Sequence, residues 1–312
     1  MSTSVLFDAP GPKARKRQAL AGVIGAVVVV AIVAFLAWRM FETGQFAAAK
    51  WSIFTNPNVI LALTNALINT LIAAVLAIIL ALIFGAVFGA MRVSTVAPLR
   101  WFSTVVVEFF RAVPLVLLIL FVFLGFAPTL QSISNDLGIT AAMDSAGLGR
   151  SQGALASLVI GLTLYNGSVL AEIFRAGIQS VPRGQREAAY AIGLSIGQTL
   201  RLILAPQAIR TMLPAIVSQS VVALKDTSLG LIVAYPELVQ QGRLIATGYN
   251  NYIPMAILVG TIYILINYSL SKFASYLSTR QQRTKKLAPI KADPTLPPDT
   301  MIELETERQL KD

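Results

Sequence analysis

Long apolar stretches recur along this chain and constrain its fold more than any other feature. An α-helix needs about 20 mostly apolar residues to cross roughly 30 Å of hydrocarbon. Six stretches meet this requirement: Ala19–Trp38, Leu61–Ala90, Trp101–Leu124, Ala154–Ile178, Leu213–Ala234 and Tyr252–Tyr276. Hydrophobic residues make up 55% of the chain and charged residues only 13%, against about 25% charged in soluble domains. We therefore predict an all-α membrane protein with six transmembrane helices.

The first stretch resembles a signal peptide because it follows a basic N-terminal segment, residues 1–18. The apolar part of a signal peptide has about 7 to 15 residues and ends in a small-residue cleavage site. Here the run is longer and ends at Trp38-Arg39, a pair suited to the membrane interface. We interpret 19–38 as a retained span.

The distribution of basic residues predicts the orientation. Most Lys and Arg residues outside the spans lie in the N-terminus, in the segments after spans two and four, and in the C-terminal segment. The other set of connections contains only Arg39, Lys50, Arg150 and Arg243. Basic residues favour the cytoplasmic side, so we expect both termini in the cytoplasm. Residues 277–312, rich in proline and charge, are predicted to form a disordered cytoplasmic tail.

The second stretch carries Gly85 and Gly89 at GxxxG spacing. Small residues four apart let two helices approach closely within a membrane. Chance also produces this pattern in helices rich in alanine and glycine. The pair indicates a helix contact without identifying the partner.

Composition excludes several functional classes. The chain has no cysteine and no histidine, so disulfides, thiolate or imidazole metal sites and catalysis by these residues are ruled out. The net charge of +10 is spread over segments that flank apolar runs, which argues against nucleic-acid binding. No GxxxxGK[ST] phosphate-binding loop occurs, so we expect no ATPase site, no bound cofactor and no enzymatic activity in this chain.

The segment 179–212, between spans four and five, is the most informative connection. It alternates charges with Ala, Ile and Leu, which favours folded over unstructured chain. Ser180 can cap a helix and Pro182 suits its first turn, while Gly193 weakens or ends it. A second amphipathic turn, 198–204, is expected to stop at Pro206. We predict two short helices with a bend at the membrane surface.

The same segment resembles the EAA signature of permeases from ATP-binding cassette (ABC) importers, EAA-x3-G-x9-I-x-L-P. The matching residues are Glu187, Ala188, Ala189, Gly193, Ile203 and Pro206. Ala205 stands where the pattern has Leu, which is an apolar exchange. In that family this loop forms a coupling helix that docks in a groove of the ATPase subunit. The resemblance implies the same role here, with Glu187 as a polar anchor beside small side chains. The alternative interpretation is an amphipathic surface helix that merely stabilises the loop.

Further segments are similar to the polar amino-acid branch of these type I importers, in particular to glutamate, glutamine and aspartate permeases. They are EFFRAVPL (108–115), AEIFRAGI (171–178), SVP (180–182) and KDTSL (225–229). The resemblance covers residues 61–276, the five-span permease core of that branch, and leaves 19–38 as an additional span. It implies a protein of a prokaryotic plasma membrane.

The resemblance also implies partners. They are a dimeric ABC ATPase that binds ATP and Mg²⁺, a second permease copy or homologue, an extracytoplasmic substrate-binding protein, the amino-acid substrate and the lipid bilayer. Nucleic acid is not among them. The expected function is ATP-driven import of a polar amino acid, glutamate first, with glutamine, aspartate or a basic amino acid as alternatives.

Charged and polar residues inside the spans are the candidates for a substrate path or gate, because a charge in hydrocarbon costs at least about 2.5 to 3.5 kcal/mol. The candidates are Lys225, Asp226, Thr227, Ser228, Glu172, Tyr165, Asn166, Glu108 and Arg111. Lys225 is a natural partner for an amino-acid carboxylate. The pairs Glu108/Arg111 and Glu172/Arg175 have i,i+3 spacing, and interfacial salt bridging explains them equally well. A polar seam between helices, or core packing, is the alternative for the others.

Two other functional classes stay open at this point. An ion-gradient-driven carrier or channel usually has repeat-related halves and interrupted spans, and no matching halves are visible in this sequence. An intramembrane enzyme needs a nucleophile and a base, and Ser168 or Ser228 has no evident base beyond Lys225.

Overall fold

The computed structural model describes residues 11–147 and 151–283, and this part of the chain is helical with no strand. Six helical segments are long and apolar enough to cross a membrane, which confirms the predicted number. They are Lys13–Glu42, Pro57–Arg92, Leu115–Asp136, Gln152–Gln179, Ile196–Val233 and Tyr252–Lys272. Most of the predicted tail, from 284 on, lies outside the described residues, whereas 277–283 continue the last helix.

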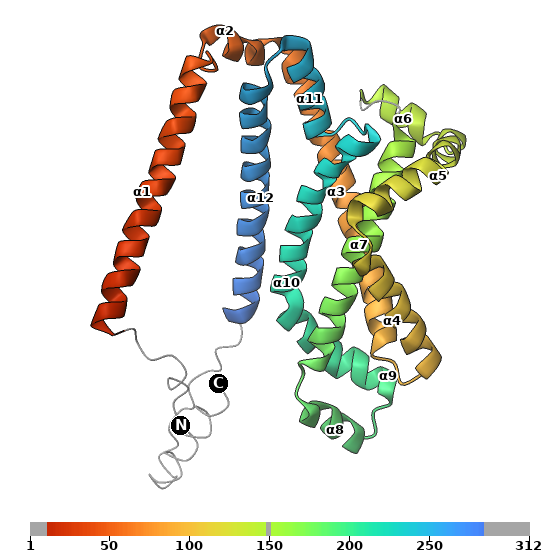
Figure 1. Cartoon of the computed structure of the whole chain (residues 1–312). Helices are drawn as coiled ribbons and strands as arrows, with labels where there is room; N and C mark the ends of the chain where they lie inside the picture. Colours follow the sequence, from red (N-terminus) through yellow and green to blue (C-terminus); the bar gives the residue numbers. More distant parts are fainter. Residues whose placement is uncertain (1–10, 148–150, 284–312) are drawn as a thin grey trace.

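Helix α1 (Pro12–Glu42) stands apart from the other long helices (Figure 1). Its sequence is apolar on every side from Ala19 to Trp38, and all of these side chains are exposed. A helix that is apolar all round has no distinct face to pack on a protein core, and its natural surroundings are lipid. The short helix α2 (Ala48–Trp51) and the turn Ser52–Thr55 connect it to α3 (Pro57–Arg92).

The core is built around α7 (Gln152–Gln179), which is the most deeply buried of the six spans. Helix α3 lies against it through a row of small residues that includes the GxxxG pair. A Cβ atom added at Gly85 would lie 2.6 Å from Leu170 Cβ, and one at Gly89 would lie 2.7 Å from Phe174 Cβ. The two glycines therefore allow α3 and α7 to touch, and α7 is the partner that the GxxxG spacing could not identify.

The predicted third span, residues 101–124, does not form a single helix. Helix α4 (Ala97–Ala112) ends before Pro114, and a separate helix α5 (Leu115–Asp136) makes the crossing. Proline has no N–H and keeps the preceding residue out of the helical region, and Val113 is extended with φ −79° and ψ 130°. Helix α4 is amphipathic, and its Ser103 hydroxyl donates to the carbonyl of Phe88 in α3 at 2.7 Å.

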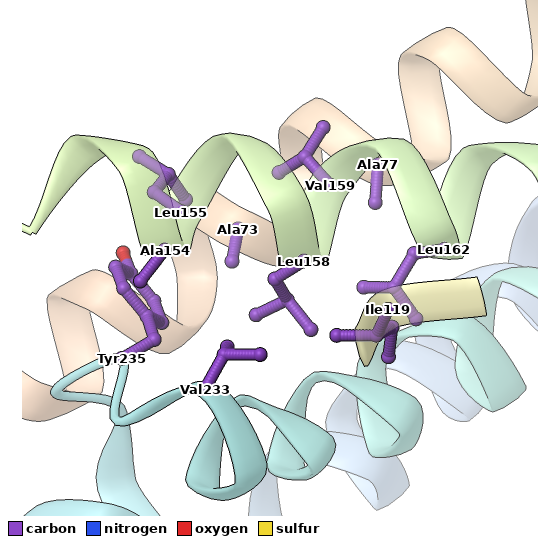
Figure 2. Close-up of a cluster of buried hydrophobic side chains, with 10 residues drawn as sticks. All are labelled: Ala73, Ala77, Ile119, Ala154, Leu155, Leu158, Val159, Leu162, Val233 and Tyr235. Carbon is purple, nitrogen blue, oxygen red and sulfur yellow. The ribbon is translucent and has the colours of Figure 1, made fainter. Parts of the chain in front are cut away.

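The helices meet in an apolar cluster at the centre of the core. Figure 2 shows Leu158 and Leu162 of α7 facing Ile119 of α5 and Val233 from the 3₁₀ segment Thr227–Val233 that follows α10 (Ala205–Asp226). The hydroxyl of Tyr235, in the same cluster, donates to the carbonyl of Asn69 at 3.1 Å. The remaining helices are α6 (Ile139–Ser145), α8 (Arg183–Ala191), α9 (Ile196–Gln198), α11 (Leu238–Tyr249) and α12 (Tyr252–Arg283).

Candidate functional site

Helix α8 carries the Glu187-Ala188-Ala189 tripeptide and lies at one end of the bundle together with α9 (Figure 1). It begins after Pro182, which occupies the capping position without a side-chain cap. Ser180 does not cap it, contrary to expectation, because α7 extends to Gln179 and the Ser180 hydroxyl donates back to the carbonyl of Gly177 at 2.7 Å.

Gly193 ends α8 by a backbone conformation that other residues rarely adopt. Its φ is +85°, in the left-handed region. Its N–H donates to the carbonyl of Tyr190 at 3.0 Å, and the N–H of Leu194 donates to the carbonyl of Ala189 at 3.1 Å. This pair of bonds is a Schellman motif, which satisfies the carbonyl groups at a helix end. The glycine of the signature therefore makes the bend.

The chain then turns back into the fifth span without a second stop. Ser195 and Gln198 form a capping box in which Ser195 Oγ accepts from the Gln198 N–H at 3.3 Å. A π-helical segment, Thr199–Leu204, leads directly into α10. The predicted stop at Pro206 is wrong, because Pro206 lies in the first turn of α10, where a missing N–H is tolerated. Ile203 is half-buried in the π-helical segment.

Every residue of α8 except Ala189 is exposed. Gly184, Glu187, Ala188 and Ala191 stand at i, i+3, i+4 and i+7 and all are exposed. We call these four residues the small-residue face. Ala189 is 3% exposed and holds α8 against the π-helical segment. Of the EAA tripeptide, Glu187 and Ala188 are therefore open to a partner, and Ala189 is a packing residue.

The two predicted i,i+3 pairs are parts of one ion-pair cluster. Arg175 bonds the carboxylate of Glu172, and Arg111 Nη1 lies 3.5 Å from Glu108 Oε1. Arg92, at the end of α3, joins them: its Nη1 lies 2.9 Å from Glu172 Oε2 and its Nη2 3.1 Å from Glu108 Oε1. The cluster therefore ties the ends of α3, α4 and α7 together. Sequence reasoning used Arg92 only as an orientation signal and missed this role.

A second polar group lies at the middle of α7, deep in the bundle. Asn166 is fully buried; its Nδ2 donates to Asp226 Oδ2 at 3.4 Å, and its Oδ1 accepts from Gln219 Nε2 at 2.6 Å. Asn166 and Asp226, both predicted candidates, are thus brought together at mid-span depth. Sequence reasoning did not select Gln219, although its spacing of seven residues from Asp226 puts both on one face of α10.

Lys225 is exposed and forms no salt bridge within the described part of the chain. The neighbouring hydroxyls are occupied locally: Thr227 donates to the carbonyl of Leu224 at 2.6 Å and Ser228 to that of Lys225 at 2.8 Å. Tyr165 is half-buried. The structure thus brings Asn166 and Asp226 together, puts Lys225 on the open side of α10, and leaves Glu108, Arg111 and Glu172 in the separate cluster at the α8 end.

Glu237 is a buried acid that sequence reasoning missed. It is fully buried and caps α11, accepting from the N–H groups of Val239 at 2.8 Å and Gln240 at 2.7 Å. The hydroxyl of Tyr263 in α12 donates to its Oε2 at 3.0 Å. The sequence offers little signal for this cap, because Glu is not among the residues preferred at helix N-caps. The residue joins α11 to α12 on the side of the core away from α8.

Comparisons with known proteins agree with this architecture. Residues 81–283 match the family described as binding-protein-dependent transport system inner membrane component. The glutamate transport system permease protein GluD of Corynebacterium glutamicum is 43% identical over 62% of this chain and 64% of its own length. The glutamate/aspartate import permease protein GltK of Escherichia coli is 34% identical over 61% of this chain and 80% of its own length.

Solved structures share the fold. A crystal structure of an amino acid ABC transporter with histidines has a TM-score of 0.56 at 25% identity, covering 70% of this chain and 94% of that chain. The MetNI methionine ABC transporter in an inward-facing conformation has a TM-score of 0.56 at 18% identity, over 72% of this chain and 98% of that chain. The six spans and the inner-membrane family description make this a multi-pass protein of the plasma membrane. The chain belongs to the family of binding-protein-dependent transport system inner membrane components.

Proposed function

We propose that this chain is the translocation subunit of an ATP-driven importer for polar amino acids, with glutamate as the first candidate substrate. The family match and the names of the relatives, which include glutamate and glutamate/aspartate permeases, support this proposal. ATP and Mg²⁺ bind to a separate ATPase dimer, because this chain has no GxxxxGK[ST] loop. The chain itself catalyses no reaction.

The small-residue face of α8 is the observation that carries the proposal. A cytoplasmic helix whose outward side is Gly, Glu, Ala and Ala lets another protein approach its backbone closely. The helix is held firmly, because Gly193 closes one end and Ala189 packs against the segment that continues into α10. A push on α8 is therefore transmitted to the fifth span.

The proposed transport cycle uses this connection between α8 and the fifth span. ATP binding closes the ATPase dimer and draws together the α8 helices of two permease copies or homologues. The spans then open to the outside, where a binding protein delivers the amino acid. Hydrolysis reverses the movement and opens the path to the cytoplasm.

The position of Lys225 is an argument for a second permease subunit beside α10. Its neighbour Asp226 bonds Asn166 at the middle of α7, so the ammonium group is near mid-depth of the membrane. An exposed charge at that depth costs at least about 2.5 to 3.5 kcal/mol against hydrocarbon. A water-filled path between two permease subunits removes that cost and puts the ammonium where an amino-acid carboxylate passes.

Reconstitution tests the function. The permease, its ATPase and its binding protein are placed in proteoliposomes, and uptake of labelled glutamate is measured with glutamine, aspartate and arginine as competitors. We expect uptake that requires ATP and the ATPase subunit. Uptake driven by an ion gradient without an ATPase would identify a secondary carrier, and a chain that transports nothing but modifies a substrate would identify an enzyme.

The coupling role is tested by Ala188→Trp, with Ala188→Ser as the matched control. The indole fills the space that a docked ATPase needs, so we expect co-purification of the ATPase and stimulated ATP hydrolysis to be lost. The serine keeps the side chain small and should preserve both. Normal coupling in the tryptophan variant would exclude α8 as the docking helix.

A further inference from the structure

A cavity of about 780 Å³ lies beside α8, on a side different from the small-residue face. The end of α3, the start of α4, the end of α7 and the loop from α8 to the π-helical segment form its walls. Helices α8 and α9 and the first turns of α4 lie at the same end of the bundle (Figure 1). No residue of the small-residue face, and neither Asn166 nor Asp226, is among the residues that line the cavity.

Arginines dominate the charge of this cavity. Arg92, Arg100, Arg183 and Arg186 line it, and no Asp or Glu is among its lining residues. Arg92 is neutralised by Glu108 and Glu172, and Arg100 Nη1 donates to a carbonyl, that of Ser94, at 3.3 Å. Arg183 and Arg186 are exposed and form no salt bridge in the described residues. A concave surface with one sign of charge attracts a counter-ion.

The spacing within α8 turns its basic residues toward the cavity. Arg183, Arg186 and Tyr190 stand at i, i+3 and i+7, and all three line the cavity. Apolar side chains complete the wall, among them Val93, Ile178 and Leu200. The lining therefore combines guanidinium groups, which bind phosphate oxygens in a bidentate manner, with surface that suits a glycerol backbone or the start of an acyl chain.

Helix α4 indicates the depth of the cavity in the membrane. Directly after Arg100, Trp101 is 70% exposed and Phe102 is 51% exposed. Tryptophan concentrates where hydrocarbon meets headgroups. An amphipathic helix with exposed aromatic residues beside a basic residue lies along that boundary, so the mouth of the cavity is at headgroup level.

We propose that this cavity, which we call the arginine cavity, binds the phosphate-bearing headgroup of an anionic phospholipid. The bound headgroup bridges α8 to the start of α4 and the end of α3, so it holds α8 against the bundle. The site requires neither the ATPase nor the substrate and is independent of the function proposed above.

The test is a binding titration of the detergent-purified, full-length permease with short-chain phosphatidylglycerol. Short-chain phosphatidylcholine, with the same chains and a neutral headgroup, and inorganic phosphate are titrated in parallel. We expect saturable binding of phosphatidylglycerol that is at least about tenfold tighter than that of the other two, as two arginine contacts predict. Equal affinity for the neutral lipid would overturn the proposal, and tight binding of inorganic phosphate alone would replace it with a free-phosphate site.

Variants locate the site. Each arginine near an anionic lipid contributes about fivefold to affinity, so the double substitution Arg183→Gln/Arg186→Gln should weaken phosphatidylglycerol binding roughly 25-fold. Arg100→Gln should weaken it about fivefold from the α4 side. The matched control is Arg201→Gln/Arg210→Gln, which removes two exposed arginines outside the cavity and should change affinity less than about twofold.

Size-exclusion elution and thermal stability confirm that the variants fold. Unchanged lipid binding in the Arg183/Arg186 variant would overturn the proposal. If that variant also lost ATPase co-purification in lipid-free detergent, the two arginines would be assigned to an acidic protein surface instead of a lipid headgroup.

Discussion

Arg92 Nη1 lies 2.9 Å from Glu172 Oε2, and this ion pair joins the end of α3 to α7. The Arg92 side chain is only 10% exposed, and its Nη2 also reaches Glu108 of α4. The sequence presents one local charge pair on α4 and another on α7, and the guanidinium of Arg92 links both pairs to the end of α3. That end also carries α8, so the cluster stiffens the part of the bundle next to α8.

Replacing Arg92 by glutamine should destabilise the protein more than replacing Arg111, the other arginine that contacts Glu108. The change leaves two carboxylates without their shared partner, and charged hydrogen bonds of this kind contribute about 1.5 to 3 kcal/mol. Arg111→Gln is the control, because its contact of 3.5 Å is largely exposed, and such a contact is worth less than about 1 kcal/mol. Thermal unfolding in detergent measures both, and equal losses would contradict the central role of Arg92.

The contact between α3 and α7 should depend on the absence of a side chain at Gly85. In Gly85→Ala the new Cβ meets Leu170 Cβ at 2.6 Å and the backbone N of Ala171 at 3.2 Å, so the helices must separate. Overpacking of this kind costs about 1 to 3 kcal/mol. Gly25→Ala in α1, where nothing lies within 4 Å, should leave the unfolding temperature unchanged or raise it. A Gly85→Ala variant as stable as that control would show that the two helices adapt freely.

The Glu237 cap should hold α11 to the bundle. Glu237→Ala removes the acceptor of two backbone N–H groups and the partner of the Tyr263 hydroxyl, for an expected loss of about 1 to 3 kcal/mol. Tyr263→Phe removes one of these bonds and should cost about 0.5 to 1.5 kcal/mol. Tyr252→Phe is the control, because its exposed hydroxyl makes only a 3.3 Å contact with Thr247. Thermal unfolding and limited proteolysis in the 236–251 connection measure this loss of stability. If the alanine variant were as protected from proteolysis as the wild type, Glu237 would not be what holds α11 to the bundle.

Lys225 should contribute to transport without contributing to ATPase docking. In Lys225→Met the ammonium is lost, so we expect the KM for glutamate uptake to rise about tenfold or more, as the loss of a charged hydrogen bond predicts. ATPase co-purification should persist. Lys272→Met, the same change in the exposed part of α12, is the control. Wild-type uptake kinetics in Lys225→Met would remove this residue from the substrate path.

Much of the architecture follows from patterns that are local in the chain. The six apolar stretches, the helix end at Gly193 and the GxxxG pair are consequences of hydrophobic length, glycine geometry and four-residue spacing. Three predictions failed on local grounds too, one of them the expected cap at Ser180, whose hydroxyl donates back to the carbonyl of Gly177 in α7. The stretch 101–124 is apolar enough to span a membrane, but Pro114 divides it, and Pro206 begins a helix rather than ending one because a π-helical segment precedes it.

The sequence alone was sufficient for the number of spans and for a short helix that carries the EAA tripeptide, because length, period and motif are properties of neighbouring residues. It could not reveal that Arg92 joins Glu108 to Glu172, that Glu237 meets Tyr263, or that Arg100 and Arg183 share one cavity. These residues belong to different helices, and their distances depend on which helix faces meet. The packing of helix faces against one another, for example of the small residues of α3 against α7, settles these distances. The periodicity of a single segment does not encode them.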